Sequence, residues 1–242
     1  MNGGQALECC VLDLETAPDC HAQVLAGRRR VADGGSSLNE VVNATVLSFG
    51  ERADGTIDGM RLQSFHRNEY SEPEILLNVD ALLTRVAEGG TLVTFNGRGF
   101  DLPMLWRRQI RWWLCGCDAV PRIDAGSCEH VDVMLDLSLG GQGRWPSLAD
   151  ACACMGFSLA GPSRAADECR FPLEMQKCER DVIGTAILYF FVLAARRRSN
   201  AALKSGLPAL GAFLRGPESG RRHLQRFALS ALLAEGATAW GA

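Results

Sequence analysis

The stretch that decides the fold is Cys10-Val11-Leu12-Asp13-Leu14-Glu15-Thr16. Its apolar residues predict a strand inside a sheet rather than at a wet edge. Side chains alternate across a strand, so Asp13 and Glu15 point to the same face. Two neighbouring carboxylates repel each other unless a cation or a shared proton relieves them, and Mg²⁺ prefers carboxylate oxygens. The pair therefore indicates a metal site, and the simpler alternative is a solvated strand end with both charges on one side.

Strand and helix patterns alternate along the rest of the chain. Strands are expected over residues 8–16, 41–51, 60–65 and 91–95. Helices are expected over residues 74–88, 102–112, 147–155 and 174–198. The less regular segments are 131–137, which fits a strand or a loop, the Gly-rich loop 28–37, and a Gly-interrupted helical tail from about residue 199. This order predicts an α/β fold with a mixed β-sheet flanked by helices.

The length of the chain suits a single domain. A chain of 242 residues can bury a full hydrophobic core. The segment after residue 199 is too small to build a core of its own. We therefore expect one domain over residues 1–242, with a core over 8–198 and a helical C-terminal tail over 199–242.

The composition indicates a globular protein of a reducing compartment. Hydrophobic residues make up 47% of the chain and charged residues 22%, which is ordinary for a soluble domain. The N-terminus lacks the pattern of a signal peptide, and the longest apolar stretch, residues 182–195, is too short to cross a bilayer. The ten cysteines are therefore expected to be free, mostly buried thiols in the cytoplasm, and no membrane partner is expected.

One group of residues offers soft metal ligands. It consists of Cys115, Cys117, Cys128 and His130. Zinc sites usually separate paired cysteines by two to four residues, whereas a single residue lies between Cys115 and Cys117. Structural zinc is therefore the less favoured explanation, and the sequence does not decide it.

The arginines gather in local clusters although the net charge is −3. The clusters lie at residues 28–30, 107–111, 196–198 and 221–226. Such patches attract a phosphate backbone whatever the net charge. Each cluster taken alone is better explained as a solvated helix end.

Two further acidic positions follow the first pair. In Asn96-Gly97-Arg98-Gly99-Phe100-Asp101 the glycines allow a tight turn, and Asp101 stands where the next helix is expected to begin. Asp181 lies in the long helix, one turn after Lys177 on the same face. Each position also has a plain structural explanation, a helix cap for Asp101 and an exposed Lys–Asp pair for Asp181.

Taken together, these stretches resemble the DEDD superfamily of 3′–5′ exonucleases, which have a ribonuclease H-like fold. The most similar group is that of predicted exonucleases related to the proofreading domain of B-family DNA polymerases. The resemblance spans about residues 8–230, and the ordered motifs are more specific together than any one of them. The matching stretches are Asp13-Leu14-Glu15-Thr16, Asn96-Gly97-Arg98-Gly99-Phe100-Asp101-Leu102-Pro103, His130-Val131-Asp132, Ser147-Leu148, and Cys178 with Asp181-Val182.

The resemblance implies a two-metal-ion exonuclease that hydrolyses phosphodiester bonds at the 3′ ends of single-stranded DNA. Two Mg²⁺ or Mn²⁺ ions about 3.5–4 Å apart would be held by four catalytic carboxylates, with Asp13 bridging them. These carboxylates are Asp13, Glu15, Asp101 and Asp181. The terminal nucleotides of the nucleic-acid partner would be contacted by Thr16, Asn96, Arg98 and Phe100.

One catalytic position departs from the family. Its third motif opens with a tyrosine or a histidine that orients or deprotonates the attacking water, and Lys177 stands there in this chain. An ammonium among carboxylates remains protonated, so Lys177 is a poor general base. It would either hydrogen-bond a hydroxide or a phosphate oxygen, or replace the charge of one metal ion and leave a site that binds ends without cutting them.

Two alternatives to a DNA exonuclease therefore stay open. The first is a catalytically weakened or inactive nuclease-fold module, which is also suggested by the departure of segment 156–177 from the family pattern. The second is an RNA exonuclease of the same fold, because contacts to the 2′-hydroxyl are not visible in a sequence.

Overall fold

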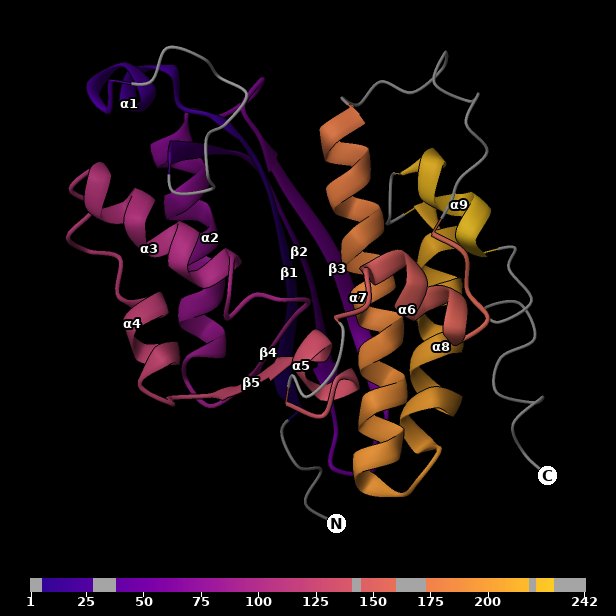
Figure 1. The fold of residues 1–242 in the computed structure, drawn as a ribbon. Coiled ribbons are helices and arrows are strands. Elements are labelled where there is room, and N and C mark those ends of the chain that lie inside the picture. Colours follow the sequence, from indigo (N-terminus) through magenta and orange to yellow (C-terminus); the bar gives the residue numbers. More distant parts are fainter. Residues whose placement is uncertain (1–5, 28–37, 141–144, 160–172, 218–220, 229–242) are drawn as a thin grey trace.

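The computed structural model describes residues 6–27, 38–140, 145–159, 173–217 and 221–228. Within these ranges it shows a mixed five-stranded sheet with helices on both faces (Figure 1). The expected α/β class with a mixed sheet flanked by helices is therefore confirmed. The expected loop at 28–37 and most of the segment that departs from the exonuclease pattern, residues 160–172, lie outside the described ranges.

The first strand, β1, lies at the centre of the sheet. The order of the strands is β3-β2-β1-β4-β5. Strand β2 runs antiparallel to its neighbours β1 and β3, whereas β4 and β5 run parallel to β1. Val11 pairs with Leu47 on one side and with Val93 on the other. The bounds are β1 Leu7–Pro18, β2 Asn39–Glu51, β3 Ile57–His66, β4 Thr91–Thr94 and β5 Glu129–Asp132. The central position of β1 explains why this strand is apolar on both faces.

The helices follow the predicted order with two additions. The expected helices correspond to α2 Glu72–Val86, α3 Asp101–Arg111, α6 Leu148–Cys154 and α7 Leu173–Arg197. The ambiguous segment 131–137 is the end of β5 followed by α5 Val133–Leu137, and the expected tail contains α8 Ala201–Arg215 and α9 Arg222–Ala228. The additions are α1 Cys20–Leu25 and α4 Ala119–Asp124, each of six residues, which is too short to give a helical period in the sequence.

Two hydrophobic cores lie on opposite faces of the sheet. Helices α2, α3 and α4 cover one face, and α5 to α9 cover the other, as Figure 1 shows. Along β1, Cys10, Leu12 and Leu14 belong to the core under α2 and α3. Cys9 and Val11 belong to the core under α7. Because side chains alternate, Asp13 and Glu15 continue the row of Val11 and face α7.

Helix α7 is the most buried helix of the fold. Its middle section packs on β1 and β2, and it contacts α6 on one side and α8 on the other. A Cβ atom at Gly184 would lie 2.9 Å from the Leu159 side chain and 3.2 Å from the sulfur of Cys152 in α6, so the glycine lets both side chains pack closely on α7. The C-terminal helices pack on this frame through buried leucines, and the Ile57 N–H of β3 donates to the Ser205 hydroxyl of α8 at 2.7 Å.

Two properties of the described ranges bear on the expected environment. None of the helices in them is both long enough and apolar enough to cross a membrane. The nine cysteines that these ranges contain are all free thiols, most of them buried or half-buried.

Candidate metal centre

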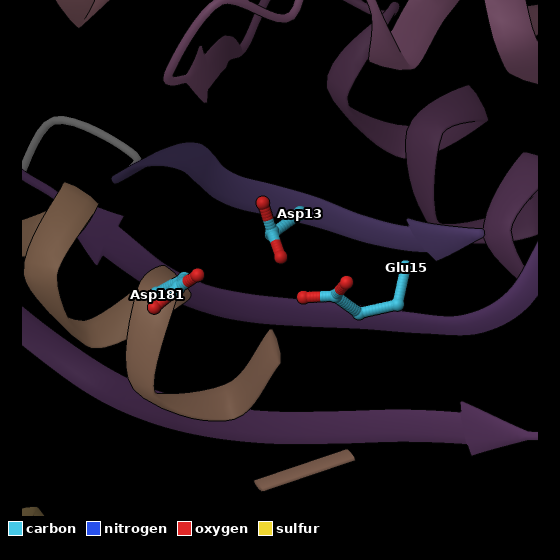
Figure 2. A group of neighbouring side chains, drawn as sticks. All are labelled: Asp13, Glu15 and Asp181. Atoms are coloured by element: carbon cyan, nitrogen blue, oxygen red, sulfur yellow. The ribbon is translucent and has the colours of Figure 1, made fainter. Parts of the chain in front are cut away.

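Three carboxylates from two elements converge beside the central strand. Asp13 and Glu15 project from β1, and Asp181 projects from the N-terminal part of α7 toward them. One oxygen of each carboxylate lies within 4.8 Å of the other two. Figure 2 shows the three side chains pointing into the same space between the strand and the helix. The spacing of one residue on β1 thus produces the shared face that the sequence predicts.

The position of α7 against β1 is fixed by the residues next to these acids. The Cys178 thiol is fully buried and donates to the backbone carbonyl of Asp13 at 3.2 Å. Asp181 stands three residues later on the same helix, which brings its carboxylate to the same side of the strand. The strand itself carries a bulge between Glu15 and Thr16, which shifts its register against β2 directly after the second acid, and the pairing then continues to Pro18.

Asp101 reaches the cluster from a third element. It is the first residue of α3 and only 2% of its surface is exposed. Its negative charge raises the pKa of Asp13, so the two carboxylates are electrostatic neighbours. Its oxygens are not among those that lie within 4.8 Å of the whole group. The structure therefore brings Asp101 beside Asp13 without placing it in the inner triad.

A tight turn between β4 and α3 positions Asp101. Asn96 has a positive φ of 66°, and a Cβ atom at Gly97 would lie 2.3 Å from the Thr94 hydroxyl oxygen, so this position requires glycine. The buried Asp132 carboxylate accepts the N–H of Asn96 at 2.9 Å and the N–H of Arg98 at 3.0 Å. Asp132 is the residue that shapes this turn, and its place in the H-x-D segment was the only sequence signal of that role.

The acids titrate abnormally because they are buried together. Burial raises the pKa of Asp13 well above its usual range, and the charges of Asp101 and Asp181 raise it further. Burial also raises the pKa of Asp101 to about 7, and the charge of Asp132 adds to this effect while a backbone hydrogen bond from Leu14 opposes it. Metal-free protein therefore holds protons here at a pH where exposed aspartates are ionised.

Two oxygens in this cluster are suited to accept a cation. Asp13 Oδ2 and Asp101 Oδ1 are buried, and neither has a hydrogen-bond partner in the described part of the chain. A buried carboxylate oxygen without a donor is costly unless a proton or a metal ion satisfies it. The donor set consists of carboxylate oxygens alone, which are the ligands of Mg²⁺ and Mn²⁺. The residues present therefore fit a hard divalent cation.

Lys177 already places a positive charge at the edge of this cluster. Its ammonium donates to Glu15 Oε1 and lies 3.3 Å from Asp181 Oδ2. Burial lowers the pKa of Lys177, but the hydrogen bond to Glu15 and the charge of Asp181 outweigh burial and raise the pKa overall. Lys177 is therefore an ammonium at neutral pH, and half of its side chain remains exposed.

The residues expected to contact nucleotides differ in their burial and in their contacts within the fold. The Thr16 hydroxyl accepts the Asn39 side-chain amide at 3.0 Å. Phe100 is half-buried against the core under α2 and α3. The Arg98 guanidinium donates to the His130 backbone carbonyl at 2.9 Å and lines a separate pocket. The role of these residues in substrate binding stays a prediction.

The soft ligands do not come together. Among the described residues, the triad of Asp13, Glu15 and Asp181 is the only group of three or more such side chains close enough to share an ion. The sulfur and nitrogen ligands that were considered for zinc therefore do not form a common site. The His130 Nε2 atom instead lies 2.9 Å from the Thr94 hydroxyl.

Several clustered arginines are engaged in ion pairs with the fold. Arg108 binds Asp19 at 2.8 Å and Glu72 at 2.5 Å, and all three side chains are buried. Arg196 binds Glu129 at 2.9 Å and Asp136 at 2.7 Å. The cluster at 28–30 lies outside the described ranges. Arg108 and Arg196 thus hold elements of the fold together through ion pairs.

Sequence reasoning missed one buried acid next to the site. Glu179 is fully buried on α7, where it binds Arg221 at 2.6 Å and His223 at 2.8 Å and accepts the Ser64 hydroxyl at 2.7 Å. Glu179 stands in the charged stretch Lys177-Cys178-Glu179-Arg180-Asp181, where nothing in the sequence separates a buried acid from an exposed one. Comparisons of the sequence with models of known protein families and with curated proteins return no match.

Proposed function

We propose that this chain is a metal-dependent 3′–5′ exonuclease of the DEDD type that acts on single-stranded DNA ends. The observation that carries the proposal is the convergence of Asp13, Glu15 and Asp181 within 4.8 Å, with the buried Asp101 beside them. These are the four acids that the resemblance assigns to metal binding. The mixed sheet with its acidic central strand supports a ribonuclease H-like fold.

The carboxylates have distinct roles in this proposal. Asp13, Glu15 and Asp181 would hold one divalent ion, and Asp101 together with Asp13 would hold the other. Bound divalent ions lower the pKa of a water molecule and stabilise the charge on the departing 3′ oxygen. The raised pKa values of Asp13 and Asp101 mean that ion binding displaces protons from these residues, so affinity rises with pH.

Lys177 does not act as the general base in this proposal. Its pKa is raised, so it carries no free lone pair at neutral pH. An ammonium next to Glu15 and Asp181 is placed to donate a hydrogen bond to a phosphate oxygen of the strand. In the metal-free protein its charge offsets those of Glu15 and Asp181.

The experiment is degradation of a 5′-labelled single-stranded DNA oligonucleotide with Mg²⁺ or Mn²⁺. We expect shortening from the 3′ end by wild type and its loss in the Asp13→Ala variant, which excludes a contaminating nuclease. An intact substrate over a wide range of enzyme concentrations, with both ions, overturns the proposal. A matched RNA oligonucleotide in competition tells whether the 2′-hydroxyl is accepted.

The ion pairs of Lys177 favour a second candidate, a module that binds nucleic-acid ends without hydrolysis. In that case the ammonium takes the place of a metal ion between Glu15 and Asp181. The Lys177→Tyr variant restores the residue type of the family motif. Cleavage gained by this variant identifies a weakened enzyme, whereas strand binding without cleavage in both proteins identifies the module.

A further inference from the structure

A pocket of about 440 Å³ is lined by Arg98 and Leu102, which flank Asp101 in the sequence. It is formed by the first turns of α3, by α4 and by β5, which neighbour one another in Figure 1. The volume is within the range of sites for small ligands. Arg98 lines this pocket with its side chain and contributes its backbone to the turn of the candidate metal centre.

The walls of the pocket suit a flat, apolar ligand. Leu102 and Pro103 from α3 and Val120 and Pro121 from α4 form the apolar lining. Trp106 completes it and is 40% exposed, although it belongs to a helix whose other large residues are mostly buried. An exposed indole over an apolar pocket is a platform on which an aromatic ring stacks.

The polar groups of the pocket suit an anionic ligand that also carries N–H donors. Arg98 is exposed, and its donation to the His130 carbonyl holds the guanidinium at the pocket. Burial and the charge of Arg98 lower the pKa of His130 to about 4, so the imidazole is neutral at pH 7 and Arg98 is the cation here. The exposed Asp124 carboxylate on α4 is an acceptor for donors of the ligand.

We propose that this pocket binds one nucleotide, with the base stacked on Trp106, the phosphate paired with Arg98 and base N–H groups facing Asp124. The choice of a nucleotide rests on the proposed function, because Leu102 of the pocket directly follows Asp101 of the metal centre. The shared chemistry is an aromatic base that carries a phosphate. Its source is either a unit of the bound strand or a free mononucleotide.

Binding without divalent ions tests this proposal on the full-length protein. Fluorescence anisotropy in EDTA measures the affinity for a labelled single-stranded oligonucleotide, and calorimetry measures the affinity for deoxyadenosine monophosphate. Trp106→Ala is expected to weaken binding by about 5- to 150-fold, since base–aromatic stacking contributes about 1–3 kcal/mol. The matched control is Trp113→Ala, which removes an 85% exposed tryptophan that does not line the pocket.

A second variant tests the charge and does not depend on the fold around Trp106. Arg98→Gln is expected to reduce the slope of log affinity against log salt for the oligonucleotide by about 0.7, as expected for one lost phosphate contact on a single strand. If Arg98→Gln weakens binding of the oligonucleotide only, the pocket is a subsite for the strand. If it weakens binding of the mononucleotide only, the pocket is a site for a free nucleotide.

Unchanged affinity for both ligands in Trp106→Ala and Arg98→Gln overturns the proposal, as does the absence of any binding by wild type. These results are distinguishable from failure of the proposed function. If binding depends on Trp106 but no cleavage occurs in Mg²⁺ or Mn²⁺, the exonuclease proposal is refuted and the nucleotide pocket is supported. If cleavage occurs but binding does not depend on Trp106, the pocket is refuted and the exonuclease proposal is supported.

Discussion

Replacing Asp101 by Asn removes one charge from the buried cluster and is expected to stabilise the metal-free protein. Folding raises the pKa of Asp101 from an ordinary value of 3.8 to about 7. The folded state therefore binds this proton more tightly than the unfolded state. Stability is highest below the unfolded-state pKa and falls as the pH rises toward the folded-state pKa.

The magnitude follows from this shift. A difference of about 3 units corresponds to about 4 kcal/mol at pH 8, where Asp101 is ionised in both states. At pH 5 the folded state still holds the proton while the unfolded state has lost it, and Asp101 lowers the free energy of unfolding by about 2 kcal/mol. We expect Asp101→Asn to gain about these amounts in the free energy of unfolding, so that the gain is larger at pH 8 than at pH 5.

Urea unfolding in EDTA between pH 5 and pH 8 measures the effect. The control is Asp118→Asn, whose carboxylate is 65% exposed and whose replacement should change stability by about 0.5 kcal/mol or less. Saturating Mg²⁺ should stabilise wild type and leave the Asp101→Asn variant less affected. A variant that is no more stable than wild type at pH 8, or a gain that does not depend on pH, refutes this reasoning.

Three further changes test other parts of the site. Lys177→Met removes the ammonium from two carboxylates of the candidate metal centre, so calorimetry should show Mg²⁺ affinity raised several-fold at low salt, whereas Lys204→Met, at an exposed lysine away from the centre, should leave the affinity unaltered. Glu179→Ala removes the fully buried partner of Arg221 and His223, and urea unfolding should show a loss of about 3 kcal/mol, whereas a loss below about 1 kcal/mol contradicts the network. Gly97→Ala forces a Cβ atom against Thr94 and should destabilise the protein by about 1–3 kcal/mol. Differential scanning calorimetry should therefore show a lower Tm, and Mg²⁺ binding should be weaker. A variant with wild-type Tm and Mg²⁺ affinity contradicts the requirement for glycine in this turn.

The elements that the sequence predicted are those in which apolar residues recur with a regular spacing over several turns or along a whole strand. The apolar run around Asp13 predicted a central strand because burial on both faces leaves no polar alternation. The spacing of Asp13 and Glu15 predicted a shared face, because the period of a strand is two residues. Helix α2 and helix α7 were predicted because each presents several turns of apolar residues.

The parts that sequence could not predict depend on contacts between distant segments. Helices α1 and α4 are held by tertiary contacts, such as Asp19 with Arg108, rather than by a periodic pattern. That Asp101 lies beside Asp13 follows from the packing of α3 on β1, and only the resemblance suggested it. The engagement of Lys177 with Glu15 depends on the register of α7 against β1, which no local signal encodes.

The attachment of α9 limits how this chain can be shortened. The Glu179 carboxylate is fully buried two positions before Asp181 on α7, and Arg221 and the His223 ring bind it. A truncation before residue 221 removes both partners and leaves the buried Glu179 carboxylate without them, beside the turn of α7 that carries Asp181. Fragments that end before residue 221 are therefore expected to be less stable around Asp181, the α7 member of the candidate metal centre.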